Sequence, residues 1–127
     1  MRLPASGLIT AADLQPLPLG ERVLFRTQNS DQRLLHNAQF QKTFVALAPD
    51  TAALLVERGV KLVGIDYLAC ERGDNNQWPV HKTLLAHGIV IVESCDLSAV
   101  PAGQYQLSVL PLRLRDLDGS PCRAVLY

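Results

Sequence analysis

Residues 54–67, LLVERGVKLVGIDY, decide the fold class of this chain. They predict the end of a short helix, a stop at Gly59 and then a buried strand over residues 61–67, because glycine commonly ends helices and apolar runs are typical of strands covered by helices. Pro49 stands where the first residue of that helix would lie. Asp66 therefore falls at the carboxyl end of a buried strand.

A second helix and a second strand follow in the sequence. Pro79 opens the helix, Gly88 closes it, and residues 89–92 form another apolar strand that ends at Glu93. A strand, a helix and a strand at this spacing favour parallel pairing of the two strands. The helix and the return strand should therefore bring His81 and Glu93 close together at the same edge of one sheet.

The remaining segments complete the expected sheet. Residues 22–27 alternate as a strand does, residues 28–41 are polar and indicate a loop, and segments 104–115 and 122–127 favour antiparallel pairing. We therefore expect one α/β domain over residues 1–127, with a mixed sheet and short helices.

The amino-acid composition is that of a folded protein, and its balanced charge indicates no strongly charged partner. The 127 residues are 48% apolar and carry 12 basic and 12 acidic side chains, so the formal net charge is zero. This balance argues against nucleic acid and against an anionic membrane as partners, and it permits self-association. The three cysteines form no C-x-x-C pair, which favours reduced thiols and a cytoplasmic location.

His81 and Glu93 are the best candidates for metal ligands. His81 lies in the first turn of the second helix, and Glu93 follows 12 residues later at a strand end. An imidazole and a carboxylate suit a divalent metal such as zinc or manganese, and they also suit a general base with its orienting partner. A polar surface or capping role for His81 is the alternative. His36 and His87 have no ligand spacing and read as surface residues.

Asp66 and Arg26 are candidates for lining the same site. A carboxylate at the end of a buried strand either belongs to a site or caps a neighbouring loop, since it needs hydrogen-bond donors in both cases. Arg26 ends another strand, and Asp66 is a possible partner for its charge. Cys70 and Cys95 also lie near strand ends, where they read as small buried residues rather than nucleophiles.

Consecutive blocks of the sequence resemble the cyclase family of metal-dependent hydrolases, which includes bacterial kynurenine formamidase. The blocks follow the family's order and gaps over nearly the whole chain. They are GLITAADL, ERVLFRT, FVALAPDTAALLVERGVKLVGIDYLACE, HKTLLAHGIVIVE, DLSAVPAGQYQLSVLPLRL and DGSPCRAVL.

The resemblance implies a swivelling β/β/α fold, a homo-oligomeric state and hydrolysis of amides such as N-formylkynurenine with one or two divalent metals. It also implies that His81 and Glu93 match metal-ligating positions. The family's other site residues come from an upstream segment, H-x-G-T-H-x-D-x-P-x-H, which these 127 residues do not contain. The resemblance is therefore to the C-terminal two-thirds of a family member.

The expected function follows from this incomplete set of ligands. A hydrolytic metal site needs about three protein ligands and an open position, and His81 and Glu93 supply two. We expect weak or absent binding of zinc or manganese, impaired catalysis, and a small-molecule-binding module that forms a homo-oligomer, most simply a dimer. One alternative is an active hydrolase completed by another subunit or chain. The other is a non-catalytic partner of a longer homologue.

Overall fold

A three-stranded parallel sheet lies at the centre of the molecule. The computed structural model describes residues 7–73 and 76–127. The sheet has the order β2-β4-β5, and Val63 of β4 lies opposite Ile91 of β5. Its strands are β2 (Arg22–Phe25), β4 (Leu62–Ile65) and β5 (Val90–Val92). The prediction that the two apolar strands are parallel neighbours is confirmed.

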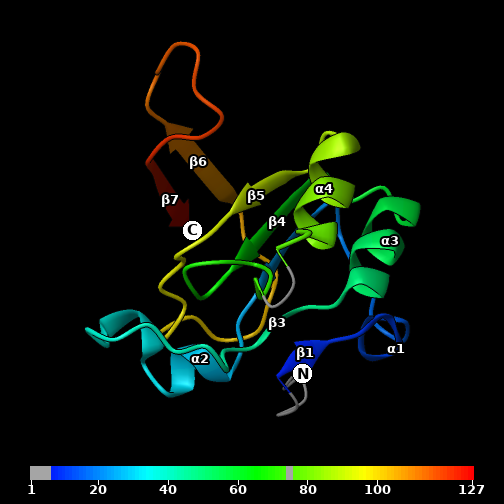
Figure 1. The fold of residues 1–127 in the computed structure, drawn as a ribbon, viewed down its shortest axis with the longest axis horizontal. Coiled ribbons are helices and arrows are strands. Elements are labelled where there is room, and N and C mark those ends of the chain that lie inside the picture. Colours follow the sequence, from blue (N-terminus) through cyan, green and yellow to red (C-terminus); the bar gives the residue numbers. More distant parts are fainter. Residues whose placement is uncertain (1–6, 74–75) are drawn as a thin grey trace.

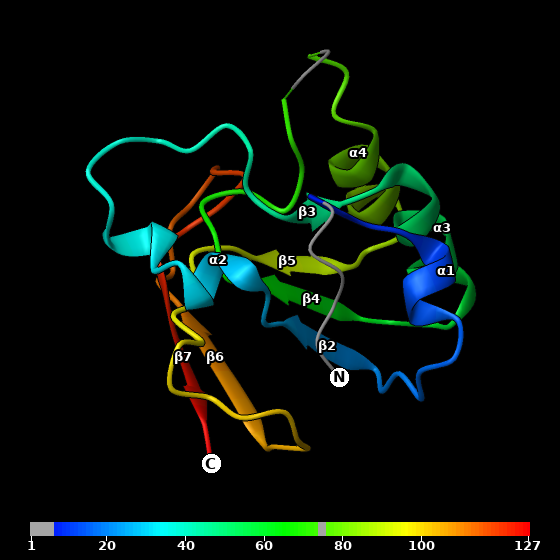
Figure 2. The ribbon, with the colours of Figure 1, turned by 90° about the horizontal axis from the view of Figure 1, so that it is seen from below.

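Two helices, α3 (Pro49–Glu57) and α4 (Pro79–Ala86), cover one face of this sheet (Figure 1, Figure 2). Both begin with proline, and both end before a glycine with positive φ, 68° at Gly59 and 69° at Gly88. The helix boundaries predicted from these residues are confirmed, because proline is preorganised for a first helical position and glycine tolerates the left-handed conformation.

The core fills the space between these helices and the sheet. Its fully buried side chains include Leu55, Val63, Ile65, Val80 and Leu84. The strand β4 is buried throughout, as its apolar run predicts, whereas the edge strand β5 is only partly buried and its first residue is exposed. In α3, Ala52 and Leu55 are buried, whereas Ala53 faces solvent.

Short elements surround the sheet. The helix α1 (Ala11–Leu14) begins with a capping box between Thr10 and Asp13. The segment expected as a loop contains two short helical turns. These turns are α2 (Gln28–Asp31) and η1 (Leu34–His36). Two short strands, β1 (Leu8–Ile9) and β3 (Ala46–Leu47), pair in parallel.

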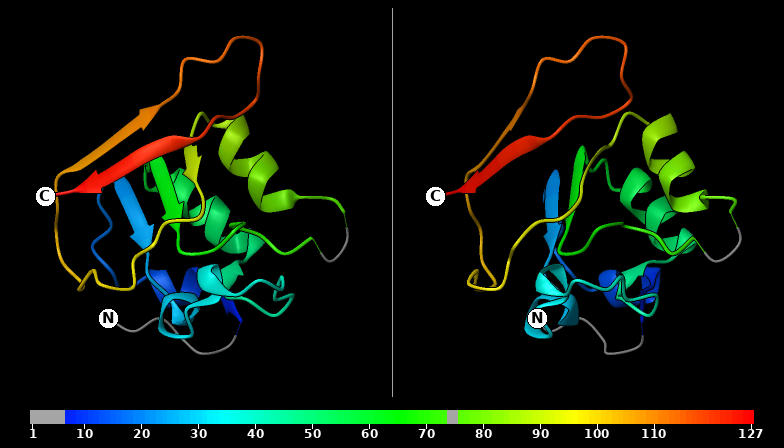
Figure 3. Two further views of the ribbon diagram at one scale, coloured as in Figure 1. Left: turned by 90° about the vertical axis from the view of Figure 1, so that its left-hand side faces the viewer. Right: turned by 60° about the vertical axis from the view of Figure 1, so that its left-hand side comes forward.

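The last two strands, β6 (Leu107–Pro111) and β7 (Cys122–Leu126), form an antiparallel hairpin. The hairpin lies on the side of the central sheet away from α3 and α4, and its loop projects from the body (Figure 3). The expected α/β class with short helices is confirmed, and the parallel and antiparallel pairs occur in separate small sheets. Within residues 7–73 and 76–127, no helix has the length and apolar character needed to cross a membrane.

Candidate metal centre

Four polar side chains meet at the carboxyl ends of β4 and β5. Cys70 and Glu71 belong to the segment that follows β4, His81 is the third residue of α4, and Glu93 directly follows β5. The return of the chain from β4 through α4 to β5 places all four at one edge of the sheet, where ligands of α/β proteins commonly bind. The predicted approach of His81 to Glu93 is confirmed.

Glu71 fixes the start of α4. The N-cap residue of α4, Trp78, makes no side-chain cap, and Glu71 takes over that role: its Oε1 accepts the backbone N–H of Val80 at 2.9 Å and its Oε2 accepts that of His81 at 3.1 Å. A carboxylate in this position also interacts favourably with the positive end of the helix. The first turn of α4, and with it His81, is therefore anchored to the end of β4.

The two ring nitrogens of His81 have different partners. Nδ1 lies 2.8 Å from Oε2 of Glu71, whereas Nε2 lies 3.2 Å from Oε1 of Glu93 and 3.6 Å from Sγ of Cys70. Oε1 of Glu93 also accepts the backbone N–H of Cys70 at 2.8 Å. The ring is thus held from one side by a buried carboxylate, its other nitrogen faces an oxygen of Glu93, and the sulfur of Cys70 lies beside the ring, 3.9 Å from Nδ1.

The electrostatics of the cluster favour a charged imidazole. Interactions with Cys70, Glu93 and Glu71 raise the pKa of His81, although its partial burial opposes them. Burial raises the pKa of the Cys70 thiol, against the lowering effect of His81. Burial also acts to raise the pKa of Glu93, but its hydrogen bonds with His81 and Cys70 outweigh that effect and lower it. A cation that binds here must displace a proton from His81, so the cluster is suited to exchanging protons for a metal.

Three of these side chains could hold a metal ion together. The candidate ligand atoms of Cys70, His81 and Glu93 all lie within 4.8 Å of one another. Cys70 is fully buried, whereas the side chains of His81 and Glu93 are 25% and 32% exposed, which leaves one side of the cluster open to solvent. Sulfur, nitrogen and carboxylate oxygen are the donors that zinc accepts in proteins. The residues present therefore fit a divalent cation.

Asp66 has a different environment. Its two oxygens accept hydrogen bonds from the backbone and hydroxyl of Thr27, from the amide of Asn29, and from the backbone and hydroxyl of Ser30, at 2.6–3.2 Å. These donors belong to the first turn of α2 and the residue before it. Asp66 is completely buried, and the contacts support the capping alternative that the sequence left open.

The expected ion pair between Arg26 and Asp66 is not formed. Nη2 of Arg26 instead donates to Oδ1 of Asp31 at 2.7 Å, and its Nε donates to the carbonyl of Leu97 at 3.1 Å. The reason is that the donors of the α2 turn already satisfy Asp66, while the partly exposed Arg26 reaches a carboxylate nearer the surface. These contacts tie both residues to the α2 region rather than to the cluster around His81.

Sequence reasoning missed the roles of Cys70 and Glu71. The sequence predicted that Cys70 is a small buried residue. It is buried, and its sulfur also lies 3.6 Å from Nε2 of His81. Glu71 lies 10 residues before His81 in a segment without periodicity, so only the tertiary structure shows that it caps α4. The prediction that His36 and His87 are surface residues is confirmed. His36 lies 3.8 Å from Asp96, and His87 contacts the carbonyl of Thr83.

Comparison with known proteins agrees with this fold. The family model named Cyclase matches residues 2–72. Cyclase-like protein 3 of Oryza sativa subsp. japonica is 41% identical over 129 aligned residues, which cover 98% of this chain and 47% of that protein. Kynurenine formamidase of Polaromonas naphthalenivorans (strain CJ2) is 39% identical over 113 residues, covering 89% of this chain and 47% of the relative.

Solved structures match over almost the whole chain. A potential metal-dependent hydrolase with cyclase activity superposes with a TM-score of 0.85 at 35% identity, over 96% of this chain and 59% of the other. A predicted metal-dependent hydrolase from Bacillus stearothermophilus gives a TM-score of 0.84 at 35% identity, over 96% and 58%. The fold is that of metal-dependent hydrolases. The chain belongs to the cyclase family, and it spans about half the length of the curated relatives it matches.

Proposed function

We propose that His81 and Glu93 bind a divalent cation as part of the centre of an amide hydrolase related to kynurenine formamidase. The observation that carries this proposal is the position of His81 Nε2, which lies 3.2 Å from the Glu93 carboxylate while Nδ1 is engaged by Glu71. A histidine whose second nitrogen contacts a carboxylate is the usual arrangement of a metal-binding imidazole. The resemblance to the family assigns the same two residues.

The cation and the residues of the chain would each contribute a part of the chemistry. A cation bound here would supply Lewis acidity toward an amide carbonyl and a water of lowered pKa. Glu71 would keep the ring of His81 oriented, and the N–H of Cys70 would hold the Glu93 carboxylate. The open side of the cluster would admit the substrate, for which an N-formyl amide is the class that the relatives indicate.

We further propose that these residues alone hydrolyse amides poorly. A hydrolase also needs a group that takes the proton from water, and the carboxylate of Glu71 is already engaged by α4 and His81. His36 and His87 make their contacts elsewhere. Efficient turnover would therefore require residues beyond these. The second candidate function is an active hydrolase completed by another subunit or chain, and the third is a non-catalytic partner of a longer homologue.

Metal titration and turnover measured on the same preparation test the proposal. Calorimetry should show binding of zinc or manganese that His81→Ala removes and His87→Ala retains, and turnover of N-formylkynurenine should be slow in all three proteins. Absence of metal binding in the unaltered chain would refute the proposal. Efficient turnover that His81→Ala abolishes would establish the composite hydrolase, and co-purification with a longer homologue would establish the partner role.

We also propose that the chain forms a homodimer in a reducing, cytoplasmic environment. Large apolar side chains are exposed on and around the β6–β7 hairpin, including Leu110, Leu112, Leu117 and Tyr127. Exposed apolar surface of this kind is typical of a protein interface, and the three unpaired cysteines support a reducing compartment. Light scattering should give a mass twice that of one chain, and a monomer at micromolar concentration would contradict the proposal.

A further inference from the structure

We infer that Cys70 is a third protein ligand in this centre and that its thiolate makes the site select zinc over manganese. The inference rests on the proposed function, in which His81 and Glu93 bind a divalent cation. It adds the sulfur donor and the preferred metal. Cys70 is the side chain of the cluster that the sequence pattern did not mark.

The distances between donor atoms match a tetrahedral ion. Sulfur, nitrogen and oxygen ligands about 2.0–2.3 Å from a tetrahedral zinc lie about 3.3–3.6 Å from one another. Sγ of Cys70 lies 3.6 Å from Nε2 of His81, and Nε2 lies 3.2 Å from Oε1 of Glu93. The sulfur also lies 3.9 Å from Nδ1, beside the ring, so a rotation of the Cys70 or His81 side chain would bring the three donors onto one ion.

The position of Cys70 fits a ligand better than a nucleophile. Its side chain is completely buried, so a substrate on the open side of the cluster would meet His81 and Glu93 first. Its backbone N–H donates to Glu93, which keeps the thiol and the carboxylate in fixed relation. A buried thiol is normally protonated and inert, whereas a bound zinc ion removes the proton from a coordinating thiol.

Glu71 orients the histidine toward the same point. Its Oε2 lies 2.8 Å from Nδ1 of His81, so Nδ1 carries the proton in the neutral ring and the lone pair of Nε2 is left for the side of Glu93. This carboxylate–histidine contact is the outer-shell arrangement found around zinc. Glu71 is therefore a positioning residue rather than a ligand.

The donor set determines which metal binds. Manganese prefers carboxylate, carbonyl and water oxygens, whereas zinc readily accepts thiolate and imidazole. A centre with one sulfur, one nitrogen and one carboxylate should therefore prefer zinc strongly. Three protein ligands leave one tetrahedral position open for water or substrate, which is the composition of a catalytic rather than a structural zinc site.

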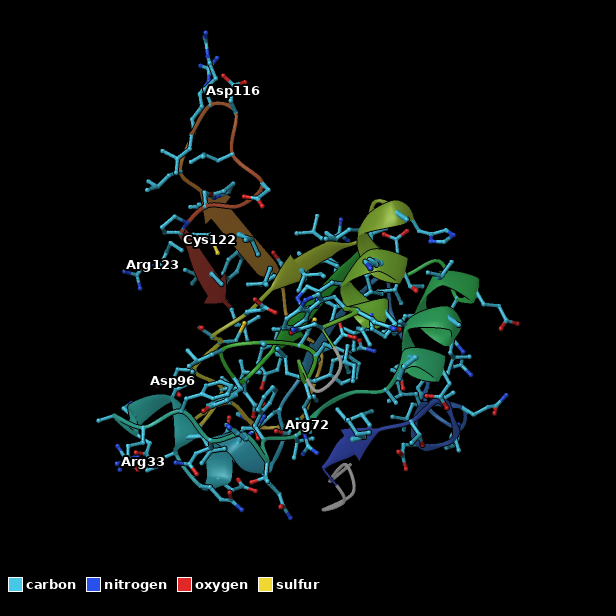
Figure 4. The ribbon with its side chains drawn as sticks, in the orientation of Figure 1. Arg33, Arg72, Asp96, Asp116, Cys122 and Arg123 are labelled. Atoms are coloured by element: carbon cyan, nitrogen blue, oxygen red, sulfur yellow. The ribbon has the colours of Figure 1, made fainter. Side chains whose placement is uncertain are left out.

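Cobalt(II) can report this coordination directly, because it substitutes for zinc and its thiolate bond gives a near-ultraviolet charge-transfer band. The measurements use a Cys122→Ser background, since Cys122 is exposed on β7 and could bind metal by itself (Figure 4). Cys70→Ser removes the inferred ligand. Cys95→Ser is the matched control, because Cys95 is partly buried and follows β5 without belonging to the cluster.

The expected result has two parts. The charge-transfer band should be present in the background protein and in Cys95→Ser, and absent in Cys70→Ser, while circular dichroism shows all three folded. Cys70→Ser should weaken zinc binding by about tenfold or more and change manganese binding little. If Cys70→Ser does not fold, Cys70→Ala in the same background and zinc-edge X-ray absorption of the Cys122→Ser protein give the same test through the presence of a sulfur scatterer.

The outcomes separate this inference from the proposed function. Cobalt binding without a thiolate band, or zinc affinity unchanged by Cys70→Ser, would overturn the sulfur ligand and leave the His81–Glu93 centre standing. No binding of any cation would overturn both. A band that disappears in Cys95→Ser and persists in Cys70→Ser would place the metal at the wrong cysteine and would also overturn the inference.

Discussion

Asp66 and Glu93 are carboxylates that follow neighbouring parallel strands, yet they occupy opposite kinds of environment. Asp66 is buried and accepts hydrogen bonds from five donors of the α2 region, whereas Glu93 is partly exposed and contacts an imidazole and one backbone N–H. Sequence position alone does not distinguish them. The number of donors that the fold has already assigned to each carboxylate decides which one can bind a cation.

The two carboxylates therefore have different expected roles at one edge of the sheet: Asp66 stabilises the fold, and Glu93 belongs to the candidate metal site. The network around Asp66 connects β4 to the start of α2, and its loss would leave buried donors without acceptors. The cluster around Glu93 has an open side and ligand atoms close together. Substitutions at the first carboxylate should therefore change folding, and substitutions near the second should change metal binding.

The largest expected effect is that of Asp66→Ala. Removing the acceptor of several buried donors should lower the free energy of unfolding by about 3–5 kcal/mol, while any folded protein should keep its metal affinity. The matched control is Asp96→Ala, since Asp96 is a half-exposed aspartate whose contacts are with Ser98 and His36 near the surface (Figure 4). Denaturant titration measures both, and equal effects of the two substitutions would remove the contrast.

Glu71→Gln should affect both properties moderately, because Glu71 caps α4 and orients His81. We expect a loss of about 1–2 kcal/mol in the free energy of unfolding and a loss of about tenfold or more in metal affinity. Glu57→Gln, on the exposed end of α3, is the control. Unchanged metal affinity in Glu71→Gln would show that the carboxylate does not position the histidine.

The stability of the metal-free protein should fall as the pH rises. The pKa of His81 is raised from 6.5 to about 11, so the charged ring stabilises the fold fully below 6.5 and loses this contribution as the pH approaches the folded value. Denaturant titrations with a chelator, at about pH 7 and about pH 9, should show a decrease that His81→Gln abolishes. A decrease of the same size in His81→Gln would assign it to other groups.

Arg26→Ala should have the smallest effect. The ion pair with Asp31 joins side chains that are 38% and 31% exposed, and exposed pairs contribute about 0.2–1 kcal/mol. The midpoint of denaturation should shift slightly, and metal affinity should stay the same. A loss comparable to that of Asp66→Ala would mean that Arg26 supports the buried network after all.

The sequence predicted much of the backbone and part of the site. Proline and glycine at fixed positions marked the ends of α3 and α4, and the apolar runs marked β4 and β5, since these signals are local. The proximity of His81 and Glu93 was predicted because a helix and a return strand bring them to one edge. The position of Glu71 and the partners of Asp66 and Arg26 were not predicted. Each depends on contacts between separate segments, and the sequence alone does not show which segments lie side by side.

The central claim is that a cation binds at the end of β5 and not at the end of β4. Crystals soaked in zinc, with diffraction data collected at the zinc absorption edge, test it most directly. The account predicts one strong anomalous peak within about 2.3 Å of His81 Nε2, Cys70 Sγ and a Glu93 oxygen, and no peak at Asp66. A peak at Asp66, or no peak near His81 at full zinc occupancy elsewhere, would contradict it.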